Sequence, residues 1–65
     1  MKKRLLTGEH LELDNGIDVV SLWFQKQTNS FCMMLNSKVI AATKTWKPIQ
    51  DRLNKIDNLK ENSNV

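Results

Sequence analysis

The fold is decided by residues 17–42, which read IDVVSLWFQKQTNSFCMMLNSKVIAA. Three runs in this stretch, at 17–25, 30–35 and 38–42, are rich in β-branched, aromatic and alternating apolar side chains, which is typical of strands. Polar residues separate the runs: a loop at 26–29 and a two-residue turn at Asn36-Ser37. The stretch therefore predicts antiparallel hairpins joined in a meander.

A further strand is expected at 9–13, because Asn15-Gly16 is the strongest short hairpin signal and would join this strand to the next. Each turn fixes a register, and directly paired residues share one face of the sheet. The expected pairs are Leu13 with Asp18, Leu11 with Val20, Trp23 with Cys32, Phe24 with Phe31, Leu35 with Lys38, Met34 with Val39, Met33 with Ile40, and Phe31 with Ala42.

These registers agree on a single apolar face, and that agreement between independent turns supports the architecture. A slip of one residue in any turn would move the apolar side chains of its strand to the other face. The residues expected on this face are Leu11, Leu13, Val20, Leu22, Phe24, Phe31, Met33, Leu35, Ile40 and Ala42.

A helix is expected at 45–59. Trp46, Ile49, Leu53 and Ile56 recur at helical spacing and form one stripe that would dock on the apolar face. Thr45 would cap this helix, with Pro48 in the first turn, where a missing N–H does no harm.

The sequence thus predicts the α+β class: a three- to four-stranded antiparallel β-meander over 9–42, followed by one C-terminal amphipathic helix on one face. Residues 1–8 form a basic N-terminal arm and residues 60–65 a polar tail that frays. With 65 residues, the chain has room for one domain, 1–65.

One helix covers only one face of a sheet, so the opposite face is the candidate interface. The residues expected on it are His10, Glu12, Val19, Ser21, Trp23, Gln25, Cys32, Met34, Val39 and Ala41. Its apolar centre, Trp23, Cys32, Met34 and Val39, is the predicted contact for a partner, because exposed apolar patches mark binding sites and Trp is enriched at hot spots. In the alternative, Leu5 and Leu6 fold back and cover Trp23.

Size also favours a partner. A domain this small buries only about 60% of its unfolded surface and often depends on a disulfide, a metal or association. The chain has one cysteine and one histidine, too few for an internal disulfide or a four-residue zinc site of Cys and His. We therefore expect a homodimer or a larger protein partner, with no metal or other cofactor.

Charge suggests a second hypothesis, a small nucleic-acid-binding protein. Residues 19–50 contain four lysines and no Asp or Glu, within a net charge of +3. Lys26, Lys44, Thr45 and Lys47 are the candidate phosphate contacts, helped by the basic arm and the start of the helix. By topology alone, with no shared motif, the arrangement resembles the small three-stranded DNA-binding domains of phage-type integrases.

Catalysis is not expected. Cys32 and His10 share the candidate face, yet they are two strands apart, and a lone cysteine is usually a small buried hydrophobe. The acids Glu9, Glu12, Asp14 and Asp18 surround the first turn without a predicted pocket for a small-molecule substrate. No apolar run approaches the length of a membrane span, and a free thiol without an export signal indicates the cytoplasm.

Overall fold

The computed structural model describes residues 1–61, which form a five-stranded antiparallel sheet and two short helices. The strands lie in the order β4-β3-β2-β1-β5, so four consecutive strands form a meander and the last returns to pair with β1. The elements are α1 (Lys2–Leu6), β1 (Leu11–Asp14), β2 (Val19–Gln25), β3 (Ser30–Leu35), β4 (Lys38–Thr43), α2 (Lys47–Asn54) and β5 (Lys60–Glu61).

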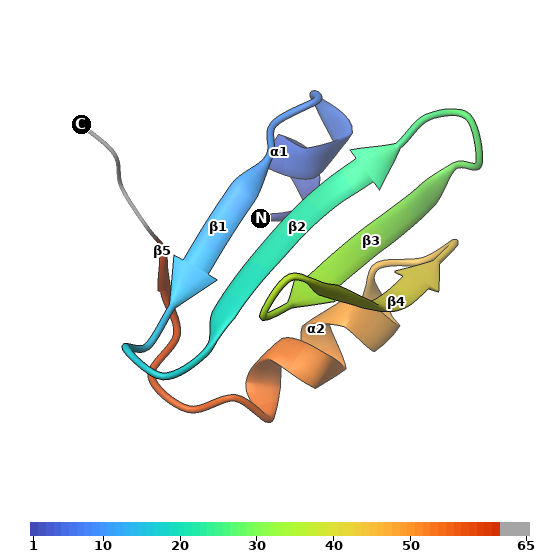
Figure 1. Cartoon of the computed structure of the whole chain (residues 1–65). Helices are drawn as coiled ribbons and strands as arrows, with labels where there is room; N and C mark the ends of the chain where they lie inside the picture. The colour runs from blue at the N-terminus through green and yellow to red at the C-terminus, as the bar shows by residue number, and fades with distance from the viewer. Residues whose placement is uncertain (62–65) are drawn as a thin grey trace.

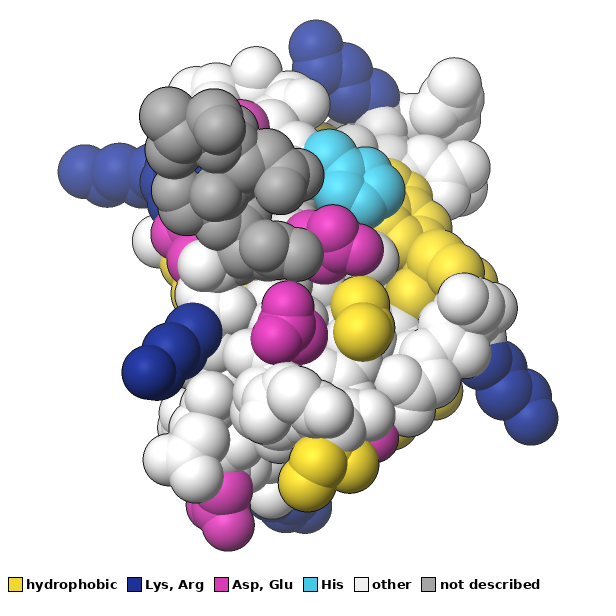
Figure 2. All heavy atoms as spheres, turned by 60° about the vertical axis from the view of Figure 1, so that its left-hand side comes forward, with side chains coloured by type: hydrophobic (Ala, Val, Ile, Leu, Met, Phe, Trp, Pro, Cys, Tyr) yellow, Lys and Arg dark blue, Asp and Glu magenta, His cyan; other side chains and the backbone are white. Residues whose placement is uncertain are grey.

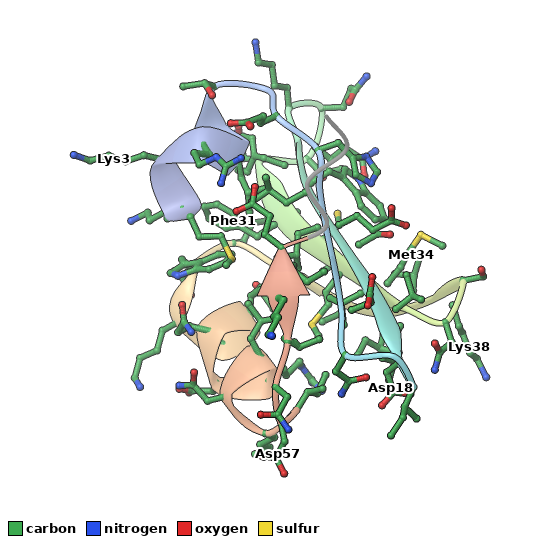
Figure 3. The ribbon with its side chains drawn as sticks, turned by 90° about the vertical axis from the view of Figure 1, so that its left-hand side faces the viewer. Lys3, Asp18, Phe31, Met34, Lys38 and Asp57 are labelled. Carbon is green, nitrogen blue, oxygen red and sulfur yellow. The ribbon has the colours of Figure 1, made fainter. Side chains whose placement is uncertain are left out.

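Both helices lie on one side of the sheet, behind it in Figure 1 and to its left in Figure 3. The predicted α+β meander with a helix packed on one face is confirmed. Apolar side chains of β1, β2 and β3 alternate toward the helices and form the core with residues of α1 and α2. The core comprises Leu5, Leu11, Leu13, Val20, Leu22, Phe31, Met33, Ile49 and Leu53.

Two of the three predicted turns are confirmed. The β3–β4 turn has positive φ at both Asn36 (51°) and Ser37 (71°), as a type I′ turn requires, and it pairs Leu35 with Lys38. The β2–β3 loop spans residues 26–29 and pairs Phe24 with Phe31. Next to these turns, the β2–β3 and β3–β4 registers are therefore the predicted ones.

The predicted register of the first hairpin is wrong by two residues. Leu13 pairs with Val20 rather than Asp18, and Leu11 pairs with Leu22 rather than Val20. The Asn15 side chain is the physical reason: its Oδ1 accepts the backbone N–H groups of residues 17 (2.9 Å) and 18 (2.8 Å) and stabilises a four-residue loop. Because the shift is an even number, the leucines still face the core.

The second half of β4 also departs from the prediction, because a β-bulge shifts the register between Met33 and Met34. Met33 pairs with Ala41 instead of Ile40, and Phe31 pairs with Thr43 instead of Ala42. An extra residue in one strand reverses the facing of the residues after it. Ala41 therefore packs against the core beside Ile40, while Ala42 is exposed on the opposite face.

The helix α1 lies within residues 1–8, which were predicted to form a basic N-terminal arm. Leu5 is fully buried in the core between the sheet and the helices, while Leu6 remains 43% exposed. The alternative in which Leu5 and Leu6 cover Trp23 is therefore wrong, because Leu5 packs on the other side of the sheet.

The helix predicted at 45–59 is shorter, since α2 ends at Asn54. Pro48 lies in its first turn as predicted, but the N-cap is Trp46, and no side chain caps the helix. Thr45 is therefore not the cap. Asn58 adopts a left-handed backbone (φ 62°), which helps the chain turn back toward β1.

The predicted frayed tail is wrong at its start, because Lys60 and Glu61 form β5 against β1; residues 62–65 lie outside the described residues. Arg4 of α1 holds this strand in place. Its guanidinium donates to Glu9 (2.7 and 3.0 Å) and to Glu61 (2.8 Å). These hydrogen bonds lower the pKa of both carboxyl groups, and the cluster joins α1, the connection before β1, and β5.

Candidate functional site

The candidate site is the side of the sheet that faces away from both helices. Figure 3 shows Phe31 pointing toward the helices and Met34 pointing the other way. Strand pairing brings together seven residues here, and we refer to them as the Trp23 face. They are Val19, Ser21 and Trp23 of β2, Cys32 and Met34 of β3, and Val39 and Ala42 of β4.

The centre of the Trp23 face alternates large and small side chains. Ser21 is paired with Met34, and Trp23 is paired with Cys32 in the neighbouring row. The two large side chains therefore lie on one diagonal of this four-residue square, and the two small ones lie on the other.

None of the seven residues is charged, and several remain open to solvent. Val39 is 57% exposed and Val19 is 42% exposed, while Trp23 and Met34 are half-buried. Neither helix covers them, and within residues 1–61 the ring that stacks on the indole is that of His10. The β2, β3 and β4 columns thus present an apolar surface of the kind that marks interaction sites.

His10 stacks on Trp23, with ring centroids 5.7 Å apart and ring planes 19° apart. Figure 2 shows the histidine directly beside a run of hydrophobic side chains, with acidic side chains nearby. Strand pairing sets Glu12 beside Ser21 and Asp14 beside Val19. The β1 column of this sheet side is therefore polar and mainly acidic, while the β2–β4 columns are apolar.

Cys32 forms the floor of the Trp23 face rather than a contact point, because it is only 4% exposed. Its Sγ lies 3.8 Å from the Gln25 Oε1 and 3.8 Å from the backbone oxygen of Ser30. Burial raises the pKa of the thiol, which keeps it protonated at neutral pH. His10 contacts the indole instead of the sulfur, so the described residues form no thiolate–imidazole pair.

The residues predicted to contact phosphate gather around the start of α2 and the β2–β3 loop. Lys44 donates from Nζ to the backbone oxygen of Thr28, which ties the β4–α2 connection to that loop. Lys47 lies 3.5 Å from the Asp51 carboxylate one turn along the helix. Two of the predicted cations therefore already have acceptors within the chain.

The other two predicted phosphate contacts are exposed. Lys26 lies in the β2–β3 loop, and its backbone oxygen accepts the N–H of Asn29. The backbone oxygen of Thr45 accepts the hydroxyl proton of Thr43 at 2.8 Å. Lys26 thus shares its loop with Thr28, the residue whose backbone oxygen Lys44 contacts, so this hydrogen bond connects the β2–β3 loop to the β4–α2 connection.

The acidic residues around the first turn do not converge. Glu9 bonds to Arg4, and Asp18 accepts the Asn36 side-chain N–H at 2.9 Å. Asp14 accepts the backbone N–H of Gly16. In the described part of the chain, no three Asp, Glu, His or Cys side chains are grouped as a metal site would need.

A shallow groove of about 420 Å³ was not predicted from the sequence. It lies between Met1, the end of α2 and the segment 55–59. Its lining includes the leucines Leu13, Leu53 and Leu59 and two amide residues of α2, Gln50 and Asn54. No sequence signal pointed to it, because residues 55–59 were expected to continue the helix and close this space.

All four residues predicted to form the interface lie on the Trp23 face, although Cys32 is buried below the surface. The sequence did not anticipate the stacking of His10 on Trp23. It also assigned Ala41 and Ala42 to the wrong faces, since a bulge leaves no clear mark in a short apolar strand.

The fold and this site define a two-layer α+β domain with one sheet face uncovered by its helices. No protein-family model, curated protein or solved structure matches the chain, so the topological resemblance to integrase DNA-binding domains gains no support. Within residues 1–61, neither helix has the length and apolar character needed to cross a membrane.

Proposed function

We propose that this chain is a small protein-interaction module that binds another protein surface through the Trp23 face. The observation that carries the proposal is the placement of both helices on the same side of the sheet. The other side keeps Trp23, Met34 and Val39 outward without a helix over them. Covering such side chains is worth roughly 25 cal/mol per Å² of apolar surface.

The size of the domain makes this gain important. A core of nine buried side chains supplies a domain of this length with only about 3–5 kcal/mol of net stability. A partner that covers the Trp23 face would add to that stability by mass action. This supports a role as a regulator or subunit that docks on a copy of itself or on a larger protein.

A binding role also fits the chemistry of the site. Cys32 is buried with a raised pKa, and the seven residues of the Trp23 face include no charged group that could transfer a proton. We therefore propose a non-enzymatic protein that takes no small-molecule substrate. A cytoplasmic location is part of the proposal, because a single free thiol suits a reducing compartment.

Site-specific photo-crosslinking in the producing cell tests the proposal whatever the identity of the partner. A benzophenone amino acid at Val39, which is 57% exposed on the Trp23 face, should give discrete protein adducts after irradiation. The matched control is Ile17, which is 86% exposed in the β1–β2 loop and lies outside the face. Adducts at position 39 but not 17 are the expected result.

A second variant shows whether those adducts depend on the face itself. Met34 pairs with Val39 across β3 and β4, so Met34→Glu places a charge beside the crosslinker without touching the core. The adducts should then weaken strongly, since burying an unpaired carboxylate is costly. Equal crosslinking from positions 17 and 39, or none from either, would contradict the proposal.

The alternative function is nucleic-acid binding through the basic end of the molecule. It is supported by the hydrogen bond from Lys44 to Thr28, which associates the Lys26 loop with the start of α2. It ranks second because Arg4 is engaged by Glu9 and Glu61, and Lys47 is paired with Asp51. Phosphate contacts would have to displace or outcompete these carboxylates.

Fluorescence anisotropy with duplex and single-stranded oligonucleotides at ~50 mM salt tests this alternative, since phosphate contacts are strong at low salt. Binding that weakens in Lys26→Gln and Lys44→Gln, and that falls steeply as salt is raised, would favour it. The control is Lys55→Gln, a substitution just beyond the end of α2, far along the helix from its start. No binding at low salt would remove the alternative.

A further inference from the structure

Asn15 joins the first hairpin loop to a segment near the end of the chain. Its Nδ2 donates to the backbone oxygen of Asp57 at 2.8 Å, across 42 positions of sequence. Its Oδ1 accepts the backbone N–H groups of residues 17 and 18 at 2.9 and 2.8 Å. The two ends of the carboxamide therefore have different roles: the oxygen stabilises the loop, and the nitrogen holds the connection that leads from α2 to β5.

The residue after Asn15 makes this carboxamide chemically vulnerable. Gly16 is exposed, with φ of 87°, and nothing beyond its chain neighbours lies within 4 Å of where a Cβ would stand. Its backbone N–H donates to the Asp14 carboxylate at 3.3 Å and takes no part in strand pairing. Glycine also rotates more freely than other residues. The Gly16 nitrogen therefore meets little steric hindrance when it approaches the Asn15 side chain.

We infer that Asn15 is a site of spontaneous deamidation, and that this reaction releases the segment 55–61 from the first hairpin. The Gly16 nitrogen forms a bond to the Asn15 Cγ, and the bond between Cγ and Nδ2 breaks. Ammonia leaves with the proton that the Gly16 nitrogen loses. The product is a five-membered succinimide, and water opens it at either carbonyl to give aspartate or isoaspartate at position 15.

The aspartate product loses the contact with Asp57. A carboxylate has no N–H to donate, so an oxygen of residue 15 would face the backbone oxygen of Asp57. The new negative charge also adds to those of Asp14 and Asp18, which lie beside the same loop. The carboxylate can still accept the N–H groups of residues 17 and 18, since that role needs only an oxygen. Deamidation to aspartate thus removes the long-range contact and keeps the local ones.

The segment 55–61 has few other attachments that could replace this contact. Within residues 1–61, the side chains that donate hydrogen bonds to it are those of Asn15 and Arg4, and Arg4 reaches Glu61 at an exposed site. β5 pairs with β1 through only two residues. An exposed ion pair contributes little stability, so the segment should open locally once the Asn15 contact is lost. Because residues 56–59 line the shallow groove, their release would also change its shape.

Asn36 provides a matched comparison within the same molecule. Its Oδ1 accepts the backbone N–H of Val19 and its Nδ2 donates to Asp18, both at 2.9 Å. Both carboxamides are therefore restrained by hydrogen bonds at each end. Asn36 is the more exposed of the two, but Ser37 follows it instead of a glycine. A faster reaction at Asn15 would thus reflect the glycine and not greater exposure.

Peptide mass spectrometry of the native chain, sampled over time in mildly alkaline buffer, tests the site. Asn15 should convert before Asn36, and also before Asn29, which lies in the β2–β3 loop and is followed by Ser30. Aspartate and isoaspartate should appear together, as expected when a succinimide opens. An Asn15 that stays intact, or that converts no faster than Asn29 or Asn36, overturns the site.

The variant Asn15→Asp tests the consequence directly, because it reproduces the aspartate product. Amide hydrogen exchange of residues 55–61, taken as a ratio to that of β3, should become about threefold to tenfold faster, as the loss of one hydrogen bond predicts. The ratio separates local opening from a change in global stability. Asn36→Asp, the same substitution in the other turn, should not raise it.

An unchanged ratio in Asn15→Asp, or an equal rise in Asn36→Asp, overturns the inferred release of the segment. Neither experiment involves the Trp23 face. The proposed function is therefore tested separately and stands or falls on its own crosslinking result.

Discussion

The imidazole of His10 lies over the indole of Trp23, with 5.7 Å between ring centroids. This contact connects the loop before β1 to the centre of the Trp23 face. Aromatic stacking of this kind is worth about 0.5–1.5 kcal/mol beyond the area that it covers. One side of the indole is therefore partly shielded by the chain itself, while the rest of the face stays uncovered by the helices.

Removing the imidazole should expose the indole further. We expect His10→Ala to raise the acrylamide quenching of Trp23 fluorescence, measured in a Trp46→Phe background so that only one tryptophan emits. Lys38→Ala, a change on β4 away from the stack, serves as the control. Quenching that is the same with and without His10 would contradict the stacked arrangement.

The first helix should be part of the stable core. Leu5→Ala removes a fully buried side chain and should lower the free energy of unfolding by about 2–5 kcal/mol, enough to unfold a domain of this size. Leu6→Ala, at the neighbouring exposed position, should change it by less than about 0.5 kcal/mol. Urea denaturation followed by circular dichroism measures both, and similar effects would mean that α1 does not pack as described.

Asn36 should stabilise the junction of two turns. Its Oδ1 accepts the Val19 N–H, and its Nδ2 donates to Asp18, both at 2.9 Å. Asn36→Gly keeps the positive φ but removes both bonds, so we expect a loss of about 1–2 kcal/mol in the free energy of unfolding, measured by urea denaturation. Ser37→Gly, in the same turn and also at positive φ, should be neutral or slightly stabilising. Equal losses in the two variants would argue against the role of the Asn36 side chain.

Acid should weaken the cluster that holds β5. Arg4 lowers the pKa of Glu9 and Glu61 below the ordinary 4.5, so their stabilising effect is present above that value and is lost as the pH falls through the lowered values. Both side chains are exposed, so added salt should reduce the effect. Urea midpoints between pH 7 and pH 3 should fall less steeply in Glu61→Gln than in the wild type. Identical slopes would contradict this role for Glu61.

Much of the fold could be predicted because its signals are local. The positive φ values at Asn36 and Ser37 belong to a turn that the sequence specifies. This turn sets the register in which β3 and β4 pair beside it. The β1–β2 register could not be predicted correctly, because the side chain of Asn15 stabilises a four-residue loop as effectively as Asn-Gly promotes a two-residue one. The pattern of apolar residues does not distinguish the two, since both put the leucines inside.

The elements that escaped prediction depend on long-range contacts. Residues 1–8 have the composition of a charged arm. A helix of five residues is not stable in isolation, so this one depends on the packing of Leu5 in the core. The return of residues 60–61 to β1 relies on Arg4, which is 57 residues away from Glu61. The candidate face was predictable because Trp23, Met34 and Val39 lie in the parts of the β2–β3 and β3–β4 pairs whose register was predicted correctly. Ala42 was assigned to the wrong face because of the bulge.

The most direct test of the central claim is methionine oxidation in dilute, purified protein, because two adjacent methionines lie on opposite sides of the sheet. Met33 is fully buried in the core, and Met34 belongs to the Trp23 face. Mild peroxide followed by peptide mass spectrometry should oxidise Met34 at a rate closer to that of exposed Met1 than to that of Met33. Met34 protected to the same degree as Met33 in the monomer would contradict the claim, since the face would then be covered from within.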